Sequence, residues 1–182
     1  MRYCFLLLAL PLLAADAAYD IAVYGSTPAG IASAVVAARQ GHTVALIEPT
    51  KHFGGLLTGG LSNTDFRTLE AVTGFYREYM DRAHAYYIAT YGKDSKQVTD
   101  NFFGALTEPH VSDKILRQMV AEQKSLTVLM EHHLLSAKRS SKRIEEARFR
   151  RPKAPVTVQA KIWIDATSEG ALAAAAKAPY RT

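Results

Sequence analysis

The chain has 182 residues, of which 48% are hydrophobic and 21% are charged, and its formal net charge is +5. This composition is typical of a globular protein and excludes a disordered or collagen-like chain, and the length suits one domain with a real core. The single cysteine, Cys4, excludes a disulfide framework and a Cys-x-x-Cys redox pair.

The N-terminus has the pattern of a targeting segment. Arg2 precedes an apolar run from Cys4 to Leu13, and Ala15-Asp16-Ala17 places small residues at the two positions that a signal peptidase needs. The run is shorter than the about 20 residues that span a bilayer, and it contains no twin-arginine pair. We therefore expect residues 1–17 to be a cleaved secretory signal peptide, and the mature protein to be secreted or periplasmic without stable membrane insertion. A buried N-terminal strand or helix is the alternative.

The segment from Tyr19 to Gly55 is the most informative part of the chain. A short apolar run, Ile21–Tyr24, meets a turn that contains glycine, and a small-residue helical pattern follows to about Gln40. A second apolar run, Val44–Ile47, then ends on Glu48. Strand, tight turn, helix, strand and acid in this order are typical of a dinucleotide-binding βαβ unit.

The turn itself is expected to bind a pyrophosphate. Gly25 permits a sharp turn at the end of the strand, and Gly30 lets the helix pack close to the sheet. The residues between them present backbone at the start of the helix: Ser26, Thr27, Pro28 and Ala29. Unpaired N–H groups and the positive end of the helix dipole favour an anion there. Thr27 replaces the middle glycine of the fingerprint, which the turn tolerates if its hydroxyl donates to a phosphate oxygen.

Glu48 is expected to accept hydrogen bonds from the hydroxyls of an adenosine ribose. A carboxylate at this position repels a 2′-phosphate, so NADP is disfavoured. The residues alone leave NAD and FAD undecided. A solvent-exposed acid after a strand is the plainer interpretation of Glu48.

A helical insertion is expected over about residues 66–123. It follows a glycine-rich loop, Gly54–Phe66, that has little periodicity. Apolar positions at spacings of three and four predict an amphipathic helix over residues 71–91. Ser112 is a candidate N-cap for a second helix that runs to about Gln123.

The C-terminal third is expected to contain strands and one further helix. Leu126–Met130 has the pattern of a buried strand. Three strands joined by short polar turns then predict an antiparallel meander: Leu134–Arg139, Arg143–Phe149 and Val156–Ile162. Ser168 begins a small-residue helix. The predicted fold class is therefore α/β, a Rossmann-like βαβ domain over residues 18–182 with a parallel sheet, a helical insertion and an antiparallel β-meander.

The remaining polar clusters indicate no second site. The basic segment Lys138–Lys153 has one interleaved aromatic residue and falls on an expected surface hairpin, so a solvated face is favoured over a nucleic-acid surface. His132 and His133 point to opposite faces of a strand and cannot chelate one metal as neighbours. We find no metal-ligand cluster and no Ser-His-Asp arrangement, and the sequence names no catalytic residue.

Four segments of the chain carry a resemblance to a known family. They are AVYGSTPAGIASAVVAARQGHTVALIEP, HFGGLLTGGLSNTDF, TEPHVSDKILRQMV and WIDATSEGALAAAAKAPY, and the similarity runs from Tyr19 to about Tyr180. In order and spacing they resemble the secreted or periplasmic FAD-dependent oxidoreductases of the glutathione-reductase-like superfamily.

The resemblance implies the cofactor and its contacts. The first segment would bind the ADP half of a non-covalent FAD. Gly54, Gly55, Leu56 and Thr58 would pass near the pyrophosphate and the flavin, and the backbone of Leu134 would touch the adenine. Ala166 and Thr167 would form the turn after the strand that returns to the cofactor.

The function implied is a flavoprotein oxidoreductase. The flavin would take a hydride or electrons from a small organic substrate, whose identity and acceptor the sequence leaves open, as it does the oligomeric state. A mature chain without cysteine rules out flavin enzymes that work through a disulfide. The C-terminal strand and turn that cover the flavin in this superfamily are absent, so the chain is expected to be the N-terminal part of a longer protein. The alternatives are a truncated, non-catalytic dinucleotide-binding domain and an NAD-dependent dehydrogenase.

Overall fold

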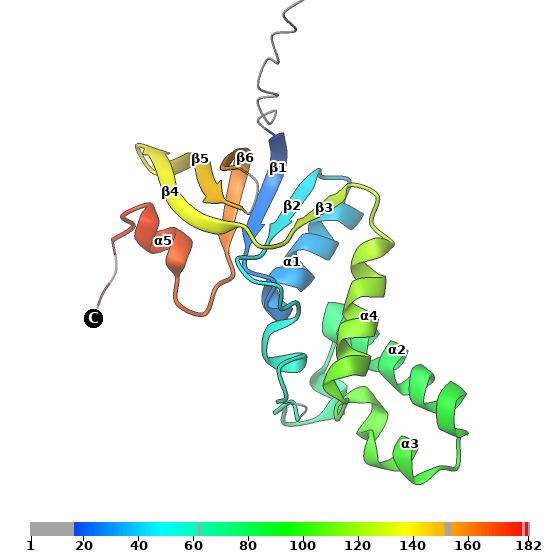
Figure 1. Ribbon diagram of the computed structural model, residues 1–182. Coiled ribbons are helices and arrows are strands. Elements are labelled where there is room, and N and C mark those ends of the chain that lie inside the picture. The colour runs from blue at the N-terminus through cyan, green and yellow to red at the C-terminus, as the bar shows by residue number, and fades with distance from the viewer. Residues whose placement is uncertain (1–16, 62, 152–153, 180, 182) are drawn as a thin grey trace, which may run out of the picture.

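The computed structural model describes residues 17–61, 63–151, 154–179 and 181 (Figure 1). The expected signal peptide lies outside the described residues except for Ala17, the first residue of the first strand. None of the helices that the described residues form has both the length and the apolar character needed to cross a bilayer.

The chain begins with a strand, a helix and a strand, continues through a run of helices, and ends with four consecutive strands and one helix. In chain order they are β1 (Ala17–Tyr24), α1 (Pro28–Arg39), β2 (Val44–Ile47), η1 (Gly55–Leu57), η2 (Leu69–Ala71), α2 (Gly74–Tyr91), α3 (Lys96–Asp100), η3 (Phe102–Gly104), α4 (Pro109–Ala121), β3 (Leu126–Leu129), β4 (His133–Ser140), β5 (Arg143–Arg150), β6 (Val156–Asp165) and α5 (Ala171–Ala175), where η marks a short 3-10 helix.

The strands form one six-stranded sheet in the order β3-β2-β1-β6-β5-β4. The first four of these strands run parallel to their neighbours, whereas β6, β5 and β4 are joined as an antiparallel meander. Figure 1 shows β1 and β2 at the centre, with the meander and α5 on one side and the helical insertion on the other. The structure confirms the predicted α/β class, the parallel sheet and the β-meander.

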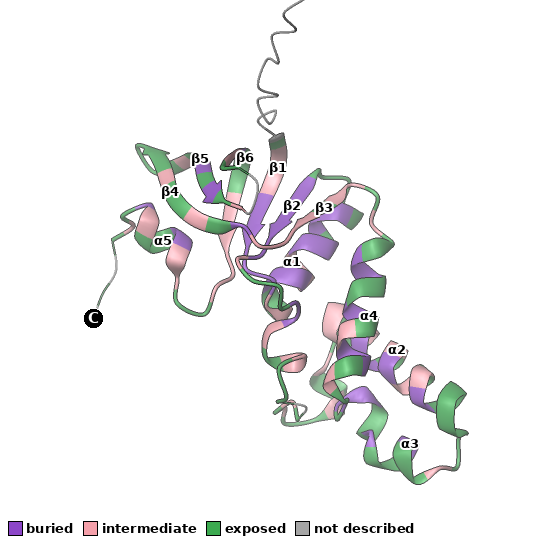
Figure 2. Cartoon of the chain, in the orientation of Figure 1, coloured by how far each residue is buried: buried purple, intermediate pink, exposed green. Residues whose placement is uncertain are grey.

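The strand β2 and the carboxyl half of β1 are buried on both faces. Val23 of β1 and Leu46 of β2 pack with α1 and α4, while Tyr24 and Ile47 on the opposite face pack with β5, β6 and α5. This alternation follows from the two-residue period of a strand. Burial on both faces explains why these strands are nearly continuous apolar runs in the sequence. Figure 2 shows the buried residues concentrated on β1, β2 and α1.

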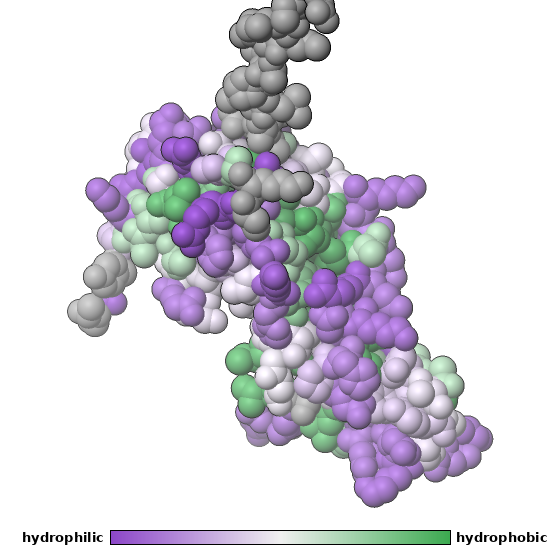
Figure 3. Space-filling view, in the orientation of Figure 1, coloured by the Kyte–Doolittle hydropathy of each residue, from purple (hydrophilic) through white to green (hydrophobic). Residues whose placement is uncertain are grey.

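The helices α2, α3 and α4 make a lobe beyond the carboxyl ends of the parallel strands (Figure 1). Its interior contains Tyr79 and Met80 of α2 and Leu116 and Met119 of α4, all with at most 1% exposure. Hydrophilic residues cover much of its outer surface in the view of Figure 3. The lobe therefore has an apolar interior and is continuous with the core through α1.

The start of α4 differs from the prediction. The helix begins at Pro109 with Glu108 as its N-cap, so Ser112 lies inside the first turn instead of capping it. Proline suits the first helical position because its missing N–H would be unpaired there. Ser112 is fully buried, and its hydroxyl lies 2.7 Å from that of Tyr79. The serine thus joins two helices.

Two further boundaries differ. The strand β3 has intermediate to exposed residues instead of buried ones, because it is the edge strand beside β2. The last helix, α5, begins at Ala171 and not at Ser168, since Gly170 precedes it with a left-handed backbone (φ 68°) that ends the preceding turn.

Candidate cofactor site

A cavity lies at the carboxyl ends of β1 and β6, which are paired through Tyr24 and Asp165. The chain leaves β1 toward α1 and β2, whereas β6 lies on the opposite side of β1, so this is a point where the strand order switches. Ligands bind at such points in open α/β sheets. The cavity has a volume of about 310 Å³, and its lining residues are Gly25, Ser26, Thr27, Glu48, Pro49, Thr50, His52, Gly55, Thr167, Ser168 and Glu169.

Gly25 and Gly30 allow a close approach of backbone segments at this point. Gly25 has a φ of +104°, and a Cβ on it would lie 2.8 Å from the carbonyl of Ala166. A Cβ on Gly30 would lie 2.0 Å from the carbonyl oxygen of Gly25. Both positions therefore require glycine, as the sequence predicts. Gly25 is needed both for its left-handed backbone and for its close contact with the turn after β6.

Thr27 caps α1 and also ties it to the turn after β6. Its hydroxyl accepts from the N–H of Gly30 at 3.2 Å and donates to the carbonyl oxygen of Ala166 at 2.8 Å. Because that donor proton is used within the protein, the hydroxyl is not free to donate to a phosphate. The threonine in place of the middle glycine thus has a structural role here.

Backbone N–H groups remain open at the start of α1. Those of Thr27 and Ala29 donate to no acceptor among the described residues, and Pro28 between them has none to donate. Such groups, together with the positive end of the helix dipole, suit a diphosphate. The glycine-lined bend therefore fits the pyrophosphate of a dinucleotide.

Glu48 faces this bend and is held by four hydrogen bonds. One carboxylate oxygen, Oε2, accepts from the backbone N–H and the hydroxyl of Ser26 at 2.9 and 2.8 Å. The other, Oε1, accepts from the backbone N–H and the hydroxyl of Thr50 at 2.9 and 2.7 Å. Burial raises the pKa of the Glu48 carboxyl, but these hydrogen bonds outweigh it and hold the pKa below its ordinary value. The side chain is thus an ionised acceptor beside the bend.

The lowered pKa of Glu48 makes a prediction about acid stability. Ionised Glu48 stabilises the folded chain above the ordinary carboxyl pKa of 4.5, and this stabilisation is lost as the pH falls through the lower folded-state value. The difference in unfolding free energy between the wild type and Glu48→Gln should therefore shrink in acid. Urea unfolding at neutral pH and at the lowest pH where both proteins fold measures it. A difference that does not change with pH would contradict the assignment.

The loop after β2 folds back on the bend. The N–H of Gly54 donates to the carbonyl of Ser26 at 2.9 Å, and Gly55 lies against Thr27 and Pro28. His52 Nε2 lies 2.9 Å from the carbonyl oxygen of Gly55, which can only accept, so this nitrogen carries the proton. The histidine thereby fixes the part of the loop that borders the cavity.

The structure brings some of the predicted site residues together and places others apart. Six line the cavity: Gly25, Ser26, Thr27, Glu48, Gly55 and Thr167. Gly30 and Ala166 pack directly behind that lining, and the N–H of Gly54 donates to the carbonyl oxygen of Ser26 within it.

The other predicted residues lie elsewhere. The side chains of Pro28 and Ala29 line a separate apolar cavity against α2. Leu56 lies on η1 and is 67% exposed. Thr58 follows the end of η1, and its hydroxyl lies 3.1 Å from Nε2 of His52. The N–H of Leu134, expected to touch adenine, donates to the hydroxyl of Tyr24 at 3.1 Å, and Leu134 is not part of the cavity lining.

Sequence reasoning missed Thr50 and His52. They follow Glu48 by two and four residues, and the Thr50 hydroxyl accepts from the N–H of His52 at 3.0 Å. Threonine often makes such local hydrogen bonds to nearby backbone in turns. A threonine two residues after a predicted ribose acid was therefore a usable signal.

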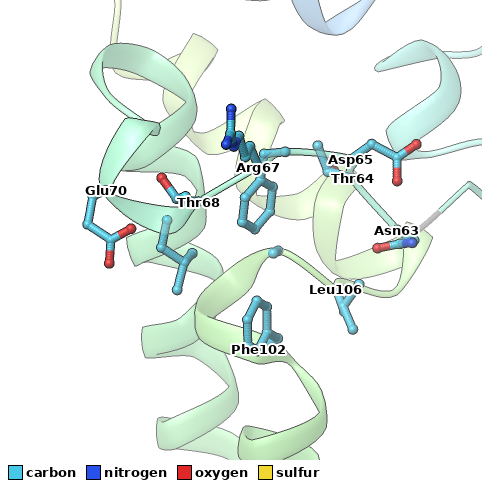
Figure 4. Close-up of a pocket in the computed structure, with 11 residues that line it drawn as sticks. Asn63, Thr64, Asp65, Arg67, Thr68, Glu70, Phe102 and Leu106 are labelled. Atoms are coloured by element: carbon cyan, nitrogen blue, oxygen red, sulfur yellow. The ribbon is translucent and has the colours of Figure 1, made fainter.

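A larger cavity of about 530 Å³ lies in the helical lobe, apart from every predicted site residue. Figure 4 shows the loop with Asn63, Asp65 and Thr68 above the turn with Phe102 and Leu106. Its walls combine polar and charged side chains with apolar ones, and no residue of the glycine-lined bend contributes to it. Within the described ranges, no group of histidine, cysteine or acidic residues could hold a metal ion.

Comparison with known proteins identifies the family. The sequence profile of the family described as "FAD dependent oxidoreductase" matches residues 20–182. The chain belongs to this family of FAD-dependent oxidoreductases. FAD is accordingly its cofactor, and the junction of β1, α1 and β6 fits the ADP half of FAD because it combines open N–H groups, glycine-dependent close contacts and an ionised acceptor. A comparison with curated proteins finds no match.

Solved structures show the same fold at low sequence identity. L-proline dehydrogenase from P. horikoshii is 19% identical with a TM-score of 0.52, and the match covers 84% of this chain and 23% of that one. The myxobacterial chondrochloren halogenase CndH is 17% identical with a TM-score of 0.54, covering 84% and 38%. Quinol fumarate reductase FrdA from E. coli is 14% identical with a TM-score of 0.54, covering 84% and 33%. The chain thus spans less than two fifths of the length of these three proteins.

Proposed function

We propose that this chain is the FAD-binding part of an oxidoreductase that acts on a small organic substrate. The observation that carries the proposal is the junction of β1, α1 and β6, where α1 begins with the open N–H groups of Thr27 and Ala29 and where Thr27 lines one cavity with the ionised Glu48. In this assignment the bend binds the diphosphate and Glu48 accepts from the ribose. Membership of the glutathione-reductase-like superfamily agrees with the order of the four similar sequence segments.

When bound, the flavin would supply the redox chemistry, because it can accept a hydride or electrons from the substrate. The chain's own residues bind and orient: the rigid turn at Gly25 sets the diphosphate position, and His52 holds the Gly54–Gly55 loop beside it. Because the pKa of the Glu48 carboxyl is lowered, the carboxylate is a weak base that would accept hydrogen bonds from ribose hydroxyls and leave their protons in place.

The proposal includes export and excludes a nucleic-acid partner. Export rests on the apolar segment after Arg2 and the small residues at Ala15 and Ala17. In the basic hairpin β4–β5, Lys138 lies 3.7 Å from Glu145 and 3.9 Å from Glu146. Arg139 donates to carbonyl oxygens at the end of α5. These internal partners support a structural role for the hairpin.

A binding experiment tests the function. The chain is expected to bind FAD in an equilibrium titration followed by flavin fluorescence, and to release free flavin on denaturation because the proposed binding is non-covalent. NAD is the comparison ligand, since it shares the adenosine diphosphate. A chain that binds NAD but not FAD would overturn the proposal.

A further inference from the structure

The four hydrogen bonds to Glu48 leave no acceptor position for a ligand. An ionised carboxylate has about four lone-pair sites on its two oxygens. Ser26 fills two of them with its N–H and hydroxyl, and Thr50 fills the other two in the same way. A ribose hydroxyl can therefore bond to Glu48 only if one of these donors withdraws.

The donors differ in how easily they can withdraw. The two backbone N–H groups are fixed by the chain, and the backbone of Thr50 is held further because its carbonyl accepts from the N–H of Glu131 at 3.1 Å. The Ser26 side chain is 1% exposed, so its hydroxyl would lose a charged partner without gaining water.

Thr50 is the exception, because its side chain is exposed and lines the cavity. The Thr50 and Ser26 hydroxyls both lie 3.4 Å from a second acceptor, the carbonyl oxygen of His52, but only the Thr50 hydroxyl can also reach water. Rotation of the Thr50 hydroxyl about its Cβ–Oγ1 bond would free a lone pair on Glu48 Oε1 without movement of the backbone. The Thr50 hydroxyl would then donate its hydrogen bond to water or to the carbonyl oxygen of His52 instead of to Glu48.

We propose that the Thr50 hydroxyl occupies the ribose position on Glu48 in the cofactor-free protein and is displaced when the adenosine ribose binds. The inference rests on the proposed function and adds to it a residue that sets cofactor affinity by competition. Thr50 thus provides a hydrogen bond to the buried Glu48 carboxylate in the absence of the cofactor, and it lowers the affinity for the cofactor because this bond must break when the ribose binds.

The test is the affinity of Thr50→Ala for ADP, which carries the ribose and diphosphate without the flavin. Removal of the competing hydroxyl should tighten ADP binding about five-fold, the size of one net hydrogen bond. Thr50→Ser keeps the hydroxyl and should bind ADP like the wild type. Thermal melts check that both variants fold, and calorimetry measures the affinities of the full chain.

A ligand without ribose hydroxyls gives the decisive control. 2′,3′-Dideoxy-ADP cannot use the freed lone pair, so Thr50→Ala should bind it no more tightly than the wild type does. Unchanged or weaker ADP binding by Thr50→Ala would overturn the inference, as would equal tightening for both ligands. If the wild type binds neither FAD nor ADP, the proposed function is wrong. That outcome is distinguishable from failure of the Thr50 inference, because it is seen in the wild type alone.

Discussion

Gly25→Ala is expected to destabilise the domain by about 3 kcal/mol or more and to abolish FAD binding. The new Cβ would combine a left-handed backbone, at φ +104°, with a 2.8 Å contact to the carbonyl of Ala166. The atoms that the new Cβ would meet belong to the backbone and not to a flexible side chain, so the ends of β1 and β6 must separate. Urea unfolding gives the free-energy loss, and FAD titration gives the loss of affinity.

Gly41→Ala is the matched control. Gly41 also has a left-handed backbone, at φ +89°, but a Cβ there would have nothing within 4 Å. Only the backbone strain of about 1 kcal/mol should appear, with FAD affinity unchanged. Equal losses in the two variants would show that the contact between Gly25 and Ala166 does not matter for the site.

Glu48→Ala is expected to have the second-largest effect. The substitution leaves the N–H and hydroxyl of Ser26 without their acceptor in a residue that is 1% exposed. Of the four hydrogen bonds that are lost, the two from buried Ser26 to the charged carboxylate should alone reduce the unfolding free energy by about 3 kcal/mol. FAD affinity should fall at least about ten-fold, because the ribose loses its acceptor as well.

Glu169→Gln controls for the loss of an acid from the same cavity. Glu169 lines the cavity but is exposed, and no described residue donates to its carboxylate. Stability should change by less than about 0.5 kcal/mol, and FAD should still bind. If Glu48→Ala retained FAD as well as this control does, Glu48 would have no part in the site.

The βαβ unit could be predicted because its signals are local. Gly25, Gly30 and Glu48 take their positions from the strand, turn and helix in which they stand, and the central strands are buried on both faces, which gives apolar runs. The same locality explains the boundary errors. Ser112 has the residue type of an N-cap, but Pro109 starts the helix earlier and Tyr79 of another helix pairs with the serine.

Other features depend on parts of the chain that lie far apart in sequence. The hydroxyl of Thr27 donates to Ala166, 139 residues away, so its structural role could not be inferred from the turn alone. The edge position of β3 follows from the strand order, which the apolar pattern of Leu126–Met130 does not encode. The hydrogen bond from Leu134 to Tyr24 likewise joins strands at different places in the sheet.

The most direct test is to follow the backbone amide resonances of the isotope-labelled chain during titration with ADP. We expect the largest shifts in two segments, Ser26–Gly30 and Glu48–Gly55, with those of Thr27 and Ala29 prominent because their N–H groups are open. Shifts confined to the cavity between Asn63 and Leu106, with the glycine-lined bend unaffected, would contradict this expectation.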